Sequence, residues 1–267
     1  MSEKQGRVLI IAGSDSGGGA GIQADIKSVT ILGGYAATAI TAVTIQNTLG
    51  VSGVHPIPTE VVKAQARAVL DDIGADAIKT GMLGDIAMVE TVAQILAQAG
   101  IPAVVDPVMI SKGGANLLAP EAVDAVRSLM IPQSALLTPN APEAEALTGL
   151  PVADLDGQRR VGEALLELGA AAVLMKGGHV PGDTVTDVLM TRDGETTFSG
   201  ERLDTRHTHG TGCTLASACA TGIAQGMPLE QAVARAWGYV HEAMRLAPGL
   251  GGGHGPLDHG WPLRKTS

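Results

Sequence analysis

The residues best suited to chemistry lie in one short run late in the chain, and they indicate a site for a phosphate-like anion. The run is His209, Gly210, Thr211, Gly212, Cys213 and Thr214, and an apolar stretch of good helix formers follows it. Two glycines around a threonine let successive backbone N–H groups turn toward one point, and the amino end of a helix adds partial positive charge. A glycine-rich turn that only starts a helix is the structural alternative. Cys213 favours the anion site, because a helix amino end lowers the pKa of a thiol.

Two better-known nucleotide motifs do not account for this chain. The segment 19–24 fits the dinucleotide fingerprint, but that fingerprint expects an acidic residue about 20 positions later, and none occurs between Asp25 and Glu60. An NAD-dependent oxidoreductase is therefore disfavoured. A P-loop needs a Gly-Lys pair in its phosphate loop, and the chain contains no such dipeptide, which excludes that class.

Short apolar runs alternate with segments of helical period along most of the chain. We expect strands at 8–12, 38–45, 77–80, 103–105, 135–137, 172–175 and 185–190, with a more polar strand near 195–203. We expect helices at 20–32, 59–73, 86–99, 120–129, 142–147, 157–168, 211–225 and 229–246. This alternation predicts an α/β fold with a mostly parallel central sheet covered on both faces.

Polar or glycine-rich residues follow the expected strands. They are Gly13-Ser14-Asp15, Gln46-Asn47-Thr48, Gly81-Met82, Asp106-Pro107, Thr138-Pro139-Asn140 and Lys176-Gly177-Gly178-His179. Because ligands of open parallel sheets bind outside the carboxyl ends of the strands, these residues should converge on one rim. One active site is implied.

Composition limits the classes of partner. The formal net charge is −9, so we expect neither a nucleic acid nor an anionic membrane, both of which bind clustered Lys and Arg. No segment reaches the ~18 consecutive apolar residues of a membrane helix, and we expect a cytoplasmic protein of one domain, 1–267, with its core at about 7–262. Cys213 and Cys219 fall on different faces of one expected helix, about 9 Å apart along its axis, and should remain thiols.

With these residues in view, the sequence resembles the ribokinase-like superfamily, in which a late Gly-Thr-Gly-Asp motif forms the anion hole and supplies a base. Cys213 stands where the sugar kinases of that superfamily have Asp. This departure resembles the hydroxymethylpyrimidine kinase branch, including the related pyridoxal kinases. Further matches run in family order and include Ala12–Asp15, Gly21–Asp25, Gln46–Thr48, Lys79–Leu83, Asp106–Met109, Thr138–Ala144 and Met175–His179.

The resemblance implies a ribokinase-like three-layer αβα sandwich, ATP and Mg²⁺ as cofactors, and a homodimer. It implies catalytic roles for Cys213, Gly210, Thr211, Gly212 and Lys176, and an acceptor site made of Gln46, Gly13, Asp25, Met82 and Val108. His209, Lys112 and Asn140 become candidates for binding phosphate, and Asp106 and Glu143 become candidates for holding the metal.

Several of these side chains have ordinary structural alternatives. Gln46 could donate to a pyrimidine ring nitrogen and accept from its exocyclic amine, or it could cap the loop after a strand. Asp25, in the first expected helix, would ordinarily be solvated. Met82 and Val108 suit either a pocket wall or the core.

The charged candidates have alternatives as well. Glu143 could complement the amino end of a helix instead of binding metal, directly or through water. His209 could cap a loop, and Lys112 lies in a glycine-bearing loop that could close over phosphate. Lys176 ends an apolar strand, so its ammonium should point into the crevice.

The branch that the sequence resembles phosphorylates a hydroxymethylpyrimidine to its monophosphate and then to the diphosphate, for thiamine biosynthesis. Pyridoxal kinase on the same fold is the alternative, and a non-catalytic binding protein would not need Lys176 or the segment 210–213. The resemblance makes Cys213 the group that takes the acceptor proton. As a hypothesis, a thiol suits the second step because it can stay neutral beside an anionic acceptor, where a carboxylate would repel it.

Overall fold

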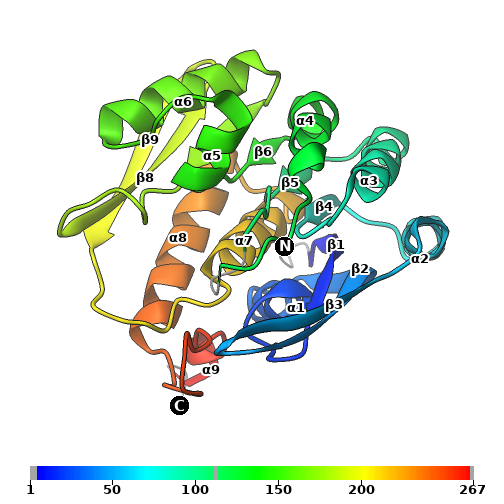
Figure 1. The fold of residues 1–267 in the computed structure, drawn as a ribbon, viewed down its shortest axis with the longest axis horizontal. Coiled ribbons are helices and arrows are strands. Elements are labelled where there is room, and N and C mark those ends of the chain that lie inside the picture. The colour runs from blue at the N-terminus through cyan, green and yellow to red at the C-terminus, as the bar shows by residue number, and fades with distance from the viewer. Residues whose placement is uncertain (1–4, 111–113, 265–267) are drawn as a thin grey trace.

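The computed structural model describes residues 5–110 and 114–264, in which the strands form one sheet between two layers of helices (Figure 1). The strands are β1 (Arg7–Asp15), β2 (Tyr35–Asn47), β3 (Gly50–Pro56), β4 (Ala77–Thr80), β5 (Ala103–Val105), β6 (Leu136–Leu137), β7 (Ala172–Met175), β8 (Thr184–Thr191) and β9 (Gly194–Glu201). Their order is β3-β2-β1-β4-β5-β6-β7-β8-β9. Strands β2, β1, β4, β5, β6 and β7 pair in parallel, while β3, β8 and β9 add antiparallel edges. The mostly parallel sheet is confirmed.

Most of the helices also follow the predicted pattern, although the short α9 (Trp261–Arg264) was not predicted. The others are α1 (Gly21–Ile31), α2 (Thr59–Asp72), α3 (Ile86–Ala99), α4 (Val123–Ala125), α5 (Ala141–Thr148), α6 (Leu155–Glu167), α7 (Thr211–Ala224) and α8 (Leu229–Arg245). No helix in the described ranges is both long enough and apolar enough to cross a bilayer.

The expected helix at 120–129 is more irregular than the sequence suggested. The segment is a series of short turns, η1 (Pro120–Ala122), α4, η2 (Val126–Met130) and η3 (Ile131–Gln133). Pro132 in the last of these turns cannot donate a backbone hydrogen bond, which prevents a regular helix from continuing.

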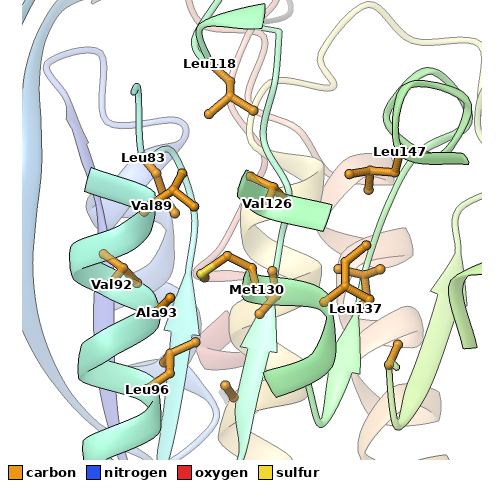
Figure 2. Close-up of a cluster of buried hydrophobic side chains, with 14 of the residues drawn as sticks. Leu83, Val89, Val92, Ala93, Leu96, Leu118, Val126, Met130, Leu137 and Leu147 are labelled. Carbon is orange, nitrogen blue, oxygen red and sulfur yellow. The ribbon is translucent and has the colours of Figure 1, made fainter. Parts of the chain in front are cut away.

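Each face of the sheet carries its own apolar core. Helices α2 to α6 cover one face, where Val89, Val92 and Leu96 of α3 pack near Val126 and Met130 (Figure 2). Helices α1, α7 and α8 cover the other face. The buried side chains there are mostly small, and a Cβ at Gly222 of α7 would lie only 2.6 Å from that of Ala232 in α8. Small residues thus let these helices lie close together.

One strand is absent from the sequence prediction. Strand β2 extends to Asn47 and turns back into β3, which pairs antiparallel at the edge of the sheet. Because β3 contains Gly50, Ser52, Gly53 and His55 and is largely exposed, it lacks the apolar alternation that marks a half-buried strand.

Candidate active site

The expected anion site forms where α7 begins beside the ends of β5 and β7. A Cβ at Gly212 would lie 3.2 Å from Lys176 Nζ and 3.6 Å from Asp106 Oδ2. Lys176 follows β7 and Asp106 follows β5. The structure therefore brings the glycine motif together with two of the strand-end residues that the sequence predicted at one rim.

Gly210 gives the start of α7 its shape. Its φ of 84° is in the left-handed region, and a Cβ there would lie 1.8 Å from the Gly19 carbonyl oxygen. Thr211 Oγ1 donates to the Thr208 carbonyl at 2.7 Å, which fixes the turn into the helix. The first N–H groups of any helix lack intrahelical acceptors, so the amides of Gly212 and Cys213 in the first turn of α7 are suited to bind an anion.

The Cys213 thiol differs from the sequence expectation. We predicted a lowered pKa at the helix amino end, but burial raises the pKa of Cys213 to about 11. Lys79 and a hydrogen bond from the Gly21 amide oppose that rise without cancelling it. The thiol is therefore neutral near pH 7, because desolvation of the thiolate outweighs the favourable charges around it.

Lys176 lies between two acidic side chains. Its Nζ donates to Asp106 Oδ1 at 3.2 Å and lies 3.8 Å from Glu143 Oε2. Burial opposes its charge, but Asp106 and Glu143 outweigh burial and raise the pKa of Lys176. Thr138 also donates to Asp106 Oδ1, at 3.3 Å. The lysine stays charged, so it can neutralise an anion at the adjacent helix terminus.

Glu143 and Asn140 cap α5. The Asn140 side chain accepts from the Glu143 amide at 2.9 Å, and Glu143 Oε2 accepts from the Asn140 amide at 2.8 Å. The helix-capping alternative for Glu143 is thus realised, and the Asn140 side-chain oxygen is engaged in the same cap. Burial raises the pKa of Glu143 to about 7, against the opposing effect of Lys176.

The carboxylates of Asp106 and Glu143 could hold a metal ion that takes only two protein ligands. No cluster of three or more His, Cys, Asp or Glu residues able to hold a metal occurs in the described parts of the chain. Mg²⁺ does not need one, because it commonly binds one or two carboxylates and completes its shell with water and substrate phosphates. Asp106 and Glu143, both nearly buried beside Lys176, match that arrangement.

Three of the predicted acceptor residues lie near the ends of β1, β2 and β4. A Cβ at Gly13 would lie 3.2 Å from Met82 Sδ, so these two residues are in contact. Gln46 is partly exposed, and its amide lies 3.0 Å from His209 Nε2. Because Gly210 follows His209, Gln46 is adjacent to the anion site. Val108 is partly exposed and follows Asp106 in the loop after β5.

Asp25 requires a correction to the expected acceptor set. It is fully buried, and both of its carboxylate oxygens lie 2.9 Å from Lys79 Nζ. Ser217 also donates to Oδ1, at 2.6 Å. Asp25 is neither solvated nor exposed on a pocket wall, and Lys79 and Ser217 occupy its carboxylate. It is close enough to Cys213 for its charge to raise the pKa of the thiol, while Lys79 lowers that pKa.

The phosphate candidates have different outcomes. His209 is buried and its Nε2 lies 2.9 Å from Asp15 Oδ2, so this nitrogen is engaged by protein groups and does not face open space for a phosphate. Lys112 lies outside the described residues.

Sequence reasoning assigned no role to two residues within the matching motifs. Lys79 lies in an otherwise apolar buried strand, and a lysine in such a place signals a buried acidic partner. Asp15 precedes a glycine-rich turn and accepts from the amides of Gly17, Gly19 and Ala20, at 2.7, 3.0 and 2.8 Å. An aspartate before such a turn commonly bonds the backbone that follows it, and that signal was available.

Comparison with known proteins identifies the family. A family model described as phosphomethylpyrimidine kinase matches residues 15–258. The chain belongs to the phosphomethylpyrimidine kinase family. A hydroxymethylpyrimidine/phosphomethylpyrimidine kinase of Streptomyces coelicolor is 51% identical over 256 residues, which cover 96% of this chain and 95% of that protein.

Two further relatives inform the comparison. The thiamine biosynthesis bifunctional protein ThiED of Geobacter sulfurreducens is 48% identical over 96% of this chain, which spans 52% of that longer protein. The structure of Bacillus subtilis pyridoxal kinase in an ADP complex superposes with a TM-score of 0.90 at 34% identity, covering 98% of this chain and 99% of that one. The ribokinase-like α/β architecture is therefore confirmed for this phosphomethylpyrimidine kinase family member.

Proposed function

We propose that this kinase uses ATP to phosphorylate 4-amino-5-hydroxymethyl-2-methylpyrimidine to its monophosphate and then to the diphosphate, in thiamine biosynthesis. One observation carries the proposal: the amino end of α7, with Cys213 in its first turn, lies against Lys176 and Asp106. This arrangement suits the transfer of a phosphoryl group, for which a protein mainly positions reactants and neutralises charge. The high identity to the Streptomyces coelicolor enzyme supports the pyrimidine acceptor.

We assign each group one task in the reaction. The amides of the segment 210–213 and the Lys176 ammonium neutralise the phosphoryl oxygens. Cys213 takes the acceptor proton in its thiolate form, which burial makes scarce and Lys79 favours. Asp106 and Glu143 would hold Mg²⁺, which would supply positive charge to offset that of the phosphates. Gln46 and Met82 bind and pack against the acceptor ring.

Pyridoxal kinase remains the second candidate because the Bacillus subtilis enzyme of that name has nearly the same fold. The test measures ATP consumed per molecule of hydroxymethylpyrimidine, with Mg²⁺ and with pyridoxal as competing acceptor. We expect two ATP per pyrimidine, little pyridoxal turnover, and loss of both steps when EDTA removes the metal. One ATP per pyrimidine, or preferential turnover of pyridoxal, would move the assignment to the second candidate.

We also propose a homodimer that forms through β2. Val43 and Ile45 are exposed and lie two residues apart, so they share one face of this strand near the sheet edge, and the exposed Leu49 follows in the turn to β3. Light scattering after size exclusion should give twice the chain mass, and Ile45→Asp should shift it toward one chain. A wild-type monomer at micromolar concentration would contradict this proposal.

We propose a cytoplasmic location. Both cysteines are free thiols, Cys213 partly exposed and Cys219 buried, which suits a reducing compartment. ATP as phosphoryl donor also favours that compartment. Fractionation of the native host with an antibody against the protein tests this, and recovery outside the cytoplasmic fraction would contradict it.

A further inference from the structure

Two side chains converge on one ring nitrogen of His209. Its Nε2 lies 2.9 Å from Asp15 Oδ2 and 3.0 Å from the atom placed as the Gln46 amide nitrogen. The ring is held in place, because a Cβ at Gly19 would lie 2.5 Å from His209 Cδ2. A ring nitrogen either carries a hydrogen and donates, or lacks one and accepts, so it cannot donate to Asp15 and accept from Gln46 together.

The ionisation of Asp15 determines whether His209 Nε2 carries a hydrogen. Its carboxylate accepts three backbone N–H groups, from Gly17, Gly19 and Ala20. Burial would raise the pKa of Asp15, but the hydrogen bonds from His209, Ala20 and Gly17 outweigh it and hold the pKa below its ordinary value. An ionised carboxylate can only accept, so Nε2 of His209 must carry a hydrogen whether the ring is neutral or charged.

The Gln46 amide must then present its oxygen to His209. The oxygen and nitrogen of a carboxamide have nearly the same shape, so their positions are assigned from the hydrogen-bond network. Exchanging them places the oxygen against His209 Nε2–H and the NH₂ group against Thr44 Oγ1, where the contact is 3.3 Å. Thr44 Oγ1 donates to the Ser14 carbonyl at 2.9 Å, so its lone pairs remain able to accept. The single Nε2–H of His209 is then shared between Asp15 Oδ2 and the Gln46 oxygen, and one N–H of Gln46 is left without a protein acceptor.

We propose that His209, held by Asp15, is a positioning residue that fixes the Gln46 carboxamide and thereby sets which way round an aminopyrimidine ring binds. This inference rests on the proposed function, in which Gln46 contacts the acceptor ring. One oxygen lone pair and one N–H of Gln46 remain for the ligand, side by side. In one orientation of the ring, the Gln46 oxygen accepts from the exocyclic amine and the Gln46 N–H donates to the adjacent ring nitrogen. In the reversed orientation the amine would face the Gln46 N–H, so two donors would meet. The ring of pyridoxal has no such amine.

The first test measures the tautomer of His209 directly. Long-range ¹H–¹⁵N correlation spectra of the free protein, labelled at histidine nitrogens, would be recorded above the pH at which histidines titrate, and His209→Gln would assign the signals. We expect Nε2 of His209 to carry the hydrogen. A bare Nε2 would overturn the inference. This measurement needs no substrate, so it decides the inference even if the protein phosphorylates neither acceptor and the proposed function fails.

The second test compares His209→Phe, which removes the donor, with His209→Gln, which can return an N–H near the same point. We expect His209→Phe to raise KM for the aminopyrimidine about tenfold and to reduce the preference over pyridoxal by a similar factor. His209→Gln should restore most of both. If KM rises for ATP or for the monophosphate while KM for the unphosphorylated hydroxymethylpyrimidine is unchanged, His209 contacts a phosphate and the inference is overturned. If His209→Phe does not fold, the histidine spectrum decides alone.

Discussion

Replacing Lys79 by Met should destabilise the protein far more than replacing a cation on its surface. Lys79 and Asp25 are both fully buried, and Lys79 Nζ lies 2.9 Å from each carboxylate oxygen. Burial opposes the charge on Lys79, but Asp25 outweighs it and raises the pKa of the lysine, so the lysine is charged. Burial also raises the pKa of Asp25, against the effects of Lys79 and Ser217, but the contact of both carboxylate oxygens with one ammonium matches an ionised pair. The variant would leave a buried carboxylate with only the Ser217 hydroxyl as partner. Breaking a buried pair from one side typically costs about 3–5 kcal/mol.

Urea unfolding followed by circular dichroism measures this free energy. The matched control is Arg159→Met, since Arg159 forms an exposed ion pair with Glu195 at 2.8 Å and exposed pairs contribute little. The double variant Lys79→Met/Asp25→Leu removes both charges and should regain most of the loss, because apolar residues can replace a buried pair at little cost. If Lys79→Met costs no more than Arg159→Met, or if the two single losses simply add in the double variant, the pair is not ionised as described.

Two other predictions concern α7, and a third concerns His259. Gly210→Ala should lower kcat by at least about tenfold, since the new Cβ would collide with the Gly19 carbonyl. The control is Gly226→Ala, which should retain activity because Gly226 has a similar φ of 83° but open space where a Cβ would lie. Burial lowers the pKa of His259 to about 4, so the folded protein favours the neutral imidazole. The free energy of unfolding in urea should therefore fall by up to about 3 kcal/mol as the pH drops from about 6.5 to about 4. The variant His259→Gln should make this pH dependence weaker. Cys213→Asp should slow the second phosphorylation more than the first in single-turnover assays, because a carboxylate would repel the anionic monophosphate. Equal losses in both steps would refute this explanation of the cysteine.

The sequence could predict the parallel core of the sheet because its strands are short, apolar and followed by polar loops. Strand β4 is buried along its whole length, and β1 is buried apart from its first and penultimate residues, so their hydrophobic runs are distinct. Strand β3 could not be recognised in the same way. Its stability comes from pairing with β2, a contact that leaves no apolar alternation in a segment with Gly50, Gly53 and an exposed face.

Some residues of the candidate site could likewise be placed from the sequence, and others could not. Asp106, Lys176 and Gly212 could be placed together from sequence because each follows a strand or starts a helix on one rim of a parallel sheet. The partner of Asp25 could not, since Lys79 is 54 positions away and only the packing of α1 against the sheet brings the two together. The pKa of Cys213 was wrongly predicted for the same reason, because neighbouring elements desolvate this partly exposed thiol and its own helix does not reveal that.

The two lysines near Cys213 differ in a way that suggests separate roles. Lys79 has no exposed surface and contacts both oxygens of one carboxylate at 2.9 Å, so an anionic substrate cannot recruit it without exposing Asp25. Lys176 keeps 14% of its side-chain surface exposed and makes longer contacts of 3.2 and 3.8 Å, shared between two carboxylates. A phosphate at the start of α7 can therefore replace one of those contacts at small cost. By this argument Lys79 sets the charge environment of the thiol, while Lys176 is the cation that contacts the transferred phosphoryl group. Their places in the chain agree with this, since Lys79 lies within β4 and Lys176 follows the last residue of β7.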